Sequence, residues 1–166
     1  MGEMQLFTDG SVNVQTKIGY GAYLAVFDGG VSLDALRLRV KVRRFEHTSS
    51  TKLELQTLLW ALNEIQPFGG KVMVYTDSQN IMTLKKRRVR HEESGYHSKR
   101  HRRINHYLLY QEFYRVMDRL NCVFVKMRGH LPSNQRNSVD QLFSLVDRAS
   151  REALRADQSA EHFSKQ

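Results

Sequence analysis

The sequence predicts an α/β fold: a five-stranded mixed sheet in which three antiparallel strands join two more strands reached by helical crossovers, with helices flanking the sheet. Two patterns carry this prediction. Residues 4–43 contain short runs with the two-residue alternation of strands, separated by turn signals. From Thr51 onward, segments with the 3.6-residue spacing of helices alternate with short apolar runs, as expected when helices connect parallel strands.

Three N-terminal strands are predicted from turn signals. Residues 4–8 form a strand that stops at Asp9-Gly10-Ser11, which puts Asp9 at its C-terminal end. Residues 18–27 and 31–43 form a hairpin around Asp28-Gly29-Gly30, because glycine accepts the positive φ that tight turns require. Within 31–43, apolar residues alternate with basic ones, which indicates one buried face and one solvated face.

The rest of the chain alternates helices with strands. A helix begins at Thr51 and ends before Pro67, and a strand over 71–76 leads to Asp77. The remaining predicted elements are a short helix at 78–84, a helix within 104–120, a strand at 122–127, a polar loop at 128–137 and a last helix after it.

Length and composition indicate one domain over residues 1–155, followed by a tail, 156–166, that we expect to be flexible. No apolar run is long enough to cross a membrane, and the N-terminus does not read as a signal peptide. Cys122 is the only cysteine, so no internal disulfide forms. We therefore expect a cytoplasmic monomer that does not use a membrane.

Positive charge is concentrated in one stretch. The chain has 26 Lys and Arg against 17 Asp and Glu, a net charge of +9, which favours a phosphate-bearing partner. Residues 85–106 hold nine Lys or Arg against two Glu, a net +7. By itself such a run is as typical of a solvated loop as of a binding surface.

Three acids each have a structural explanation when taken alone. Asp9 sits in an Asp-Gly turn signal, Glu54 completes a capping box with Thr51, and Asp77 precedes a helix start, where an N-cap is common. Together they indicate more. Two follow strands, and the third lies in the first turn of a helix, about 40° outside the apolar stripe. If the first and fourth strands are neighbours, all three acids meet at one sheet edge.

Clustered carboxylates repel one another unless cations neutralise them. Hard oxygen ligands suit Mg²⁺, with Mn²⁺ possible, and the chain has no Cys–His cluster that would favour zinc. Two such ions can activate a water and stabilise a leaving oxygen in phosphodiester hydrolysis. The sequence thus predicts a metal-dependent nuclease centred on Asp9, Glu54 and Asp77.

These residues resemble the ribonuclease H family of type 1. The motifs that carry the resemblance follow the family order over about residues 4–155. They are Asp9-Gly10-Ser11, Gly19-Tyr20-Gly21-Ala22, the helix entry from Thr48 to Leu55, Thr76-Asp77-Ser78-Gln79, and the segment from Val125 to His130. Each motif is weak alone, whereas the ordered set is specific.

The resemblance implies an endonuclease that hydrolyses the RNA strand of RNA–DNA hybrids with two metal ions, leaving 5′-phosphate and 3′-hydroxyl ends. It implies that Asp9, Glu54 and Asp77 bind the ions and that His130, in a loop, assists proton transfer or product release. It also implies a basic protrusion at residues 85–106 that grips the substrate. The implied substrate contacts are Asn13, Ser50, Thr51, Gln79, Lys85, Lys86, Arg87 and Arg88.

The fourth acid of the family has two candidates. Asp140 follows His130 by ten residues, which is close to the family spacing, whereas Asp147 follows it by seventeen. The residues from Val146 to Ala153 better resemble the family helix around this acid, so we favour Asp147. Periodicity does not decide, because residues seven apart share nearly the same helix face.

Two other functions fit the same fold. Transposases, integrases and resolvases also carry acids on such a sheet and cut DNA, although they commonly add a DNA-binding domain for which this chain has no room. A catalytically silent hybrid-binding module would need only the basic stretch. Clustered acids near phosphates would weaken such a module, which favours the nuclease.

Overall fold

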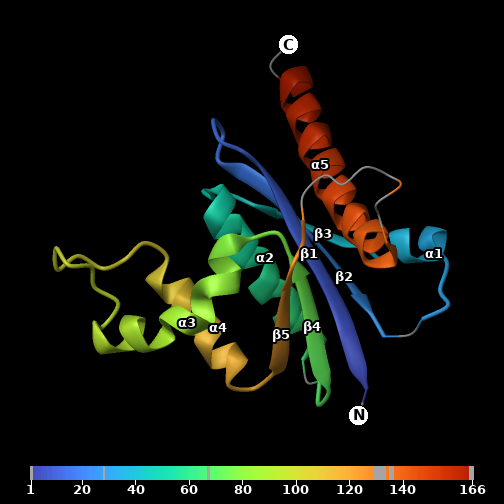
Figure 1. Ribbon diagram of the computed structural model, residues 1–166. Coiled ribbons are helices and arrows are strands. Elements are labelled where there is room, and N and C mark those ends of the chain that lie inside the picture. The colour runs from blue at the N-terminus through green and yellow to red at the C-terminus, as the bar shows by residue number, and fades with distance from the viewer. Residues whose placement is uncertain (1, 28, 67, 129–133, 135–136, 165–166) are drawn as a thin grey trace.

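The computed structural model describes residues 2–27, 29–66, 68–128, 134 and 137–164. Its centre is the predicted five-stranded mixed sheet, with strand order β3-β2-β1-β4-β5 (Figure 1). β1 pairs antiparallel with β2, and β2 with β3, whereas β1, β4 and β5 are parallel to one another. The first and fourth strands are therefore neighbours, as the convergence of the acids requires.

β1 (Glu3–Asn13) is longer than predicted, and β2 (Ile18–Val26) follows it. The predicted stop at Asp9-Gly10-Ser11 is wrong, because these residues continue to pair with β2, Asp9 opposite Ala22. The turn comes at Asn13, whose Oδ1 accepts hydrogen bonds from the backbone N–H groups of Gln15 and Thr16. Asp9 thus lies within β1 and not at its end.

The predicted strand at 31–43 is also wrong. Residues Leu33–Arg37 form a short helix, α1, and the third strand, β3, spans Lys41–Phe45. Ser32 caps α1 by accepting a hydrogen bond from the N–H of Ala35, so local capping overrides the alternating pattern. Leu36 is buried and Leu38 is 84% exposed, although an alternating strand would put both on one face.

The predicted helix near Thr51 is α2 (Ser50–Ile65), and the strand after it is β4 (Lys71–Thr76). Ser49 caps α2 by accepting from the N–H of Lys52, so a capping box with Thr51 does not explain Glu54. The predicted short helix at 78–84 continues as α3 (Gln79–Glu93), which includes part of the basic stretch.

Three elements complete the chain: α4 (Tyr107–Met117), β5 (Asn121–Lys126) and α5 (Ser138–Ser164). α5 continues into the tail that the sequence predicts to be flexible, residues 156–166, and remains helical to Ser164. An ion pair between Arg44 Nε and Asp157 Oδ1, 3.4 Å long, ties this part of the helix to β3. No helix in the described residues is long and apolar enough to span a membrane.

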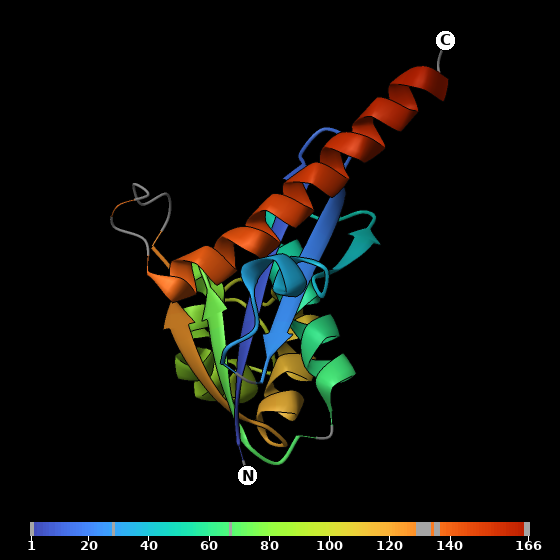
Figure 2. The same ribbon diagram turned by 90° about the vertical axis from the view of Figure 1, so that its right-hand side faces the viewer.

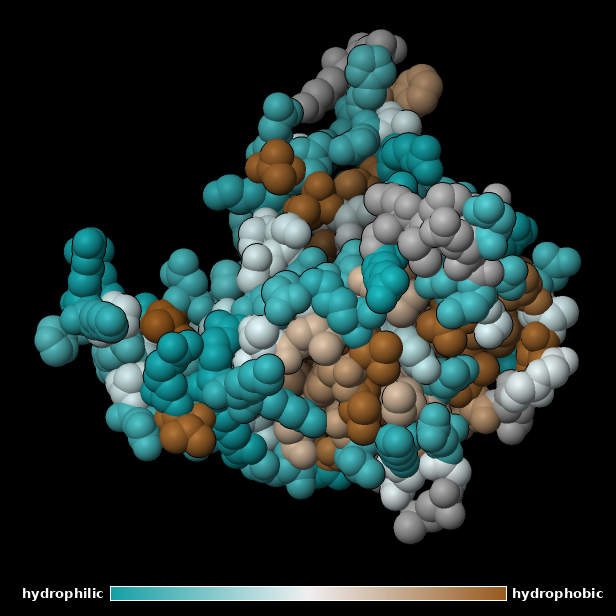
Figure 3. All heavy atoms as spheres, viewed as in Figure 1, coloured by the Kyte–Doolittle hydropathy of each residue, from teal (hydrophilic) through white to brown (hydrophobic). Residues whose placement is uncertain are grey.

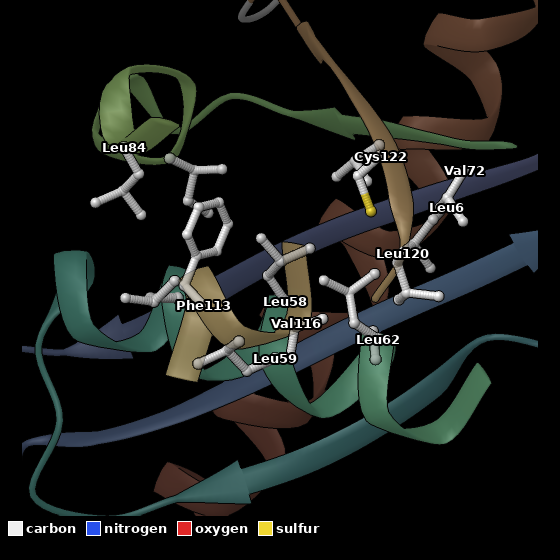
Figure 4. Close-up of a cluster of buried hydrophobic side chains, with 14 of the residues drawn as sticks. Leu6, Leu58, Leu59, Leu62, Val72, Leu84, Phe113, Val116, Leu120 and Cys122 are labelled. Carbon is white, nitrogen blue, oxygen red and sulfur yellow. The ribbon is translucent and has the colours of Figure 1, made fainter. Parts of the chain in front are cut away.

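Each face of the sheet has its own core. α2, α3 and α4 cover one face, where Leu58, Leu62 and Phe113 pack against Leu6 and Val72 (Figure 4). α1 and α5 cover the other face, where Leu36 and Val146 join strand residues such as Phe7 and Leu24 (Figure 2). The segment from α3 to α4 projects from the body and is largely hydrophilic (Figure 3). Elements from both faces thus reach the same sheet edge.

Candidate active site

Asp9 and Asp77 stand side by side on adjacent parallel strands. Phe7 on β1 pairs with Tyr75 on β4. Asp9 follows Phe7 by two residues, and Asp77 follows Tyr75 by two residues. The Phe7 and Tyr75 rings stack with centroids 4.7 Å apart, which fixes the two strands in register just before the acids. Asp9 is 9% exposed, whereas Asp77 is open to solvent at the strand end.

Asp147 on α5 adjoins Asp9. Burial first, then the negative charge of Asp77 and a hydrogen bond with Asp147, raise the pKa of Asp9 to about 8, against the opposing effect of the Gly10 backbone N–H. One turn further along α5, Ser150 shares a 3.1 Å hydrogen bond with Ser11 on β1. Matched contacts along the two elements therefore align α5 with β1.

Asp140, the alternative fourth acid, has a different task. Its Oδ2 accepts from the N–H of Asn137, and Asn137 Oδ1 accepts from the N–H of Asp140, both at 2.9 Å. This reciprocal pair satisfies backbone donors at the start of α5 in the manner of a capping box. The structure brings Asp147, and not Asp140, against Asp9.

Glu54 reaches the site from α2. Burial raises the pKa of Glu54 and the charge of Asp77 adds to this effect, whereas a hydrogen bond with Ser78 and the charge of Lys126 oppose it. Ser78 also caps α3 by accepting from the N–H of Ile81 at 3.2 Å. The acids adjoin one another in successive pairs in the order Glu54, Asp77, Asp9, Asp147, and we call this set the acid row. They come from α2, the residue after β4, β1 and α5.

The close approach of α2 to the sheet depends on glycine. A Cβ placed at Gly19 would lie 2.7 Å from Leu53 Cδ2, and one at Gly21 would overlap the side chain of Thr57. Larger residues at these positions would push α2 outward. The motif glycines therefore determine how near Glu54 comes to Asp77.

The donor set fits a hard divalent cation. All four side chains offer carboxylate oxygens, and the raised pKa of Asp9 reflects burial first and then neighbouring negative charge, which a cation would offset. Among the described residues, no three His, Cys, Asp or Glu side chains are arranged tightly enough to form a ready-made metal site. The acids instead adjoin one another in successive pairs. His130 lies outside the described residues.

Only some predicted substrate contacts lie near the acids and open to solvent. Ser50 and Thr51 are exposed at the start of α2, and Gln79 Oε1 accepts from Lys126 Nζ at 2.7 Å at the start of α3. Asn13 is half-buried and its Oδ1 serves the turn after β1.

The predicted basic contacts are mostly engaged within the protein. Lys85 Nζ donates to the carbonyl of Cys122 at 2.7 Å, and Arg87 donates to Asn80. Arg88 forms a bidentate pair with Asp118, at 2.6 and 2.8 Å. Lys86 is exposed on α3.

Sequence reasoning missed two cations beside the acids. Lys126 ends β5 opposite Thr76 of β4, so it shares the sheet edge with Asp77. Arg151 Nε lies 3.1 Å from Asp147 Oδ1, one helical turn away. The register of the parallel strands could have pointed to Lys126, and the four-residue helical spacing from Asp147 could have pointed to Arg151.

Comparison with known proteins identifies the family. The RNase H family model matches residues 1–151, so the chain belongs to the RNase H family, as its ordered motifs predict. The assignment as a ribonuclease H enzyme is confirmed at this family level. A search of curated proteins finds no match.

Solved structures share the fold at low sequence identity. The RNase H domain of prototype foamy virus is 12% identical with a TM-score of 0.68, and the alignment covers 91% of this chain and 92% of that one. LC9-RNase H1, a type 1 RNase H with the type 2 active-site motif, is 18% identical with a TM-score of 0.66, covering 92% and 72%. A foamy viral protease–reverse transcriptase in complex with RNA/DNA hybrid is 8% identical, with a TM-score of 0.65 and coverage of 91% and 19%.

Proposed function

We propose that this protein hydrolyses the RNA strand of RNA–DNA hybrids by a two-metal-ion mechanism and leaves 5′-phosphate and 3′-hydroxyl ends. The observation that carries the proposal is the row of four acids, in which Asp77 and Asp147 flank the buried Asp9. Membership of the RNase H family supports the substrate class. So does the foamy viral structure solved with a hybrid.

Each acid has a role in the proposal. Asp9, Glu54, Asp77 and Asp147 would hold two Mg²⁺ ions, for which Mn²⁺ could substitute, and Asp9 would lose its proton to bind them. When bound, the ions would lower the pKa of a water and offset the charge of the phosphate. Ser78 orients Glu54 through its hydrogen bond.

Other side chains act on the substrate in this proposal. Lys126, beside Glu54, attracts the phosphate that would otherwise be repelled by the acids. Ser50, Thr51 and Gln79 contact the nucleic acid near the row, and the shallow minor groove with its 2′-hydroxyls distinguishes the RNA strand. His130 moves a proton or assists product release.

A cleavage assay tests this function. Labelled RNA–DNA hybrid, duplex RNA and duplex DNA are incubated with protein in Mg²⁺ or in EDTA, beside the variant Asp77→Asn. We expect the unchanged protein to cleave the hybrid in Mg²⁺ but not in EDTA, and to leave duplex RNA and duplex DNA uncut. Asp77→Asn should not cleave the hybrid. The products should be degraded by an exonuclease that requires a 5′-phosphate. Cleavage of duplex DNA but not hybrid would favour the DNA-nuclease alternative, and hybrid binding without cleavage would favour the silent module.

A further inference from the structure

Basic and polar side chains continue from the acids along one flank of α5. Arg151, Arg155 and Gln158 follow Asp147 at spacings of four, four and three residues, which puts them on successive turns of the same side of the helix. All three are exposed. The flank therefore begins at the acid row and runs away from it.

Contacts with β1 determine which way this flank faces. Asp9 and Ser11 point to the same side of β1, and they meet Asp147 and Ser150 respectively. Beyond them, Ser11, Arg151, Leu154 and Arg155 line a shallow surface hollow. A second hollow, which starts at Arg155 and includes Gln158, continues toward the end of the helix.

The acids of this part of α5 lie elsewhere. Asp157 is paired with Arg44 and hydrogen-bonds Tyr20, and Glu161 follows it by one turn on the same side of the helix. Glu152 lines a hollow with Arg148 near α1. The flank is thus positive although α5 as a whole carries both signs.

Arg155 is exposed on α5 and forms no ion pair with any residue that the structure describes. Residues 158–164 also bury no side chain, and in Figure 2 this end of α5 extends past the sheet. Core packing therefore does not account for the length of the helix or for the arginine on its flank.

We propose that Arg151 and Arg155, with Gln158 beyond them, bind the sugar–phosphate backbone of the duplex several nucleotides from the cleaved bond. The inference rests on the proposed function, because it starts from the acid row as the site of cleavage. The guanidinium groups suit phosphate, which they bind through two parallel hydrogen bonds. Arg151 leaves Asp147 for the phosphate when the acid row is neutralised.

Helix geometry gives this contact a length. Arg155 stands eight residues beyond Asp147, which is about 12 Å at 1.5 Å per residue. Phosphates follow one another by about 3.4 Å along the axis of a B-form strand. In the proposed contact α5 lies along the duplex, so Arg155 meets the backbone about four nucleotides from the cleaved bond. A duplex that ends within about two base pairs of that bond is too short to meet it.

The first test measures binding without cleavage. The unchanged protein, Arg155→Gln and the control Arg119→Gln are titrated with an 18-base-pair hybrid in EDTA at several salt concentrations. Arg119 is exposed just before β5, at the end of that strand opposite Lys126, so the control removes the same charge away from the acid row and from α5. We expect Arg155→Gln to weaken binding about threefold to tenfold and to reduce the slope of log K against log salt by about 1. Arg119→Gln should match the unchanged protein. Equal melting temperatures confirm that all three are folded.

The second test measures reach. Hybrids are shortened from either end toward the cleaved bond, and kcat/KM is measured in Mg²⁺ for the same three proteins. On long hybrids we expect kcat/KM of Arg155→Gln to be about threefold to tenfold below that of the unchanged protein. This difference should vanish when the duplex on the side of the cleaved bond that α5 contacts is cut to about two base pairs, and persist when the other side is shortened.

The outcomes separate this inference from the proposed function. Equal salt slopes for Arg155→Gln and Arg119→Gln, or a deficit that persists on the short hybrids, would overturn the backbone contact while leaving cleavage intact. If the unchanged protein cleaves no hybrid, the proposed function fails. The binding comparison in EDTA then still decides whether α5 holds a duplex.

Discussion

Asp9 is a buried acid next to two other acids, and this environment determines its protonation without a cation. Its pKa of about 8 means that it keeps its proton at neutral pH. A divalent cation must displace that proton, so its binding strengthens as pH rises. Asp9 was predictable as a site residue from the motif order, but its burial was not, because the Asp-Gly signal indicated a turn.

The raised pKa of Asp9 predicts how stability of the metal-free protein depends on pH. The folded state holds the proton more tightly than the unfolded state, whose pKa is near 3.8. Its stabilising contribution is therefore complete below that value and is lost as pH rises through about 8. In EDTA, Asp9→Asn should be more stable than the unchanged protein at pH 9, by at least about 1 kcal/mol, and lose most of this advantage by pH 4, near the unfolded-state pKa. Thermal melts at both pH values measure it; a variant less stable at pH 9 would contradict the prediction.

Asp147 and Asp140 show what sequence periodicity does not resolve. They stand seven residues apart on α5 and differ in their contacts: Asp140 pairs with Asn137 at the helix start, whereas Asp147 adjoins Asp9. Assigning them requires knowing where the helix begins, which the polar sequence before it does not reveal. Three acids could thus be chosen from sequence, while the fourth needed the packing of α5 on β1.

We expect Asp147→Asn to lower kcat on RNA–DNA hybrid by at least about 100-fold, because it removes a proposed ligand of the catalytic ions. Asp140→Asn should retain activity within a few-fold and lose about 0.5–2 kcal/mol of stability through the weakened cap. Single-turnover cleavage and urea unfolding distinguish the two effects. The reverse pattern of activities would mean that Asp140 is the fourth acid.

At the element scale, local signals misled where tertiary pairing prevailed. Gly10 resembles a turn signal, yet it sits in a paired strand where a Cβ would meet Leu53 of α2. The alternating run after Gly30 resembles a strand, yet Ser32 starts a helix inside it. Helices with long apolar stripes, by contrast, were found correctly, since many residues contribute to the same pattern.

Gly21 predicts a coupling between sheet packing and the site. In Gly21→Ala the new methyl group overlaps Thr57, so α2 shifts and takes Glu54 with it. We expect a loss of about 1–3 kcal/mol in unfolding free energy, together with weaker Mg²⁺ binding. Gly29→Ala is the matched control, because a Cβ there meets nothing within 4 Å. Urea unfolding measures the loss of stability and Mg²⁺ titration measures the loss of affinity. Unchanged Mg²⁺ affinity in Gly21→Ala would contradict the prediction that the packing of α2 positions Glu54 for the ions.

At the scale of the whole molecule, the acid row joins elements that pack on opposite faces of the sheet. α2 belongs to one core and α5 to the other, while β1 and β4 carry the central pair. The sequence predicted the mixed sheet because helical crossovers require parallel strands. The full length of α5 was not predicted, since the contact between Asp157 and Arg44 is remote in sequence.

This arrangement predicts that Mg²⁺ stabilises the whole fold, because the ions neutralise acids from four elements at once. A ligand at 100 times its Kd adds about 2.7 kcal/mol, which raises the melting temperature of a protein this size by about 5–10 °C. The increase should be larger at pH 8 than at pH 6, where Asp9 is more fully protonated. Asp147→Asn should lose most of the increase and Asp140→Asn should keep it. Differential scanning calorimetry with and without Mg²⁺ measures the shift, and an equal shift in both variants would show that the ions bind away from the acid row.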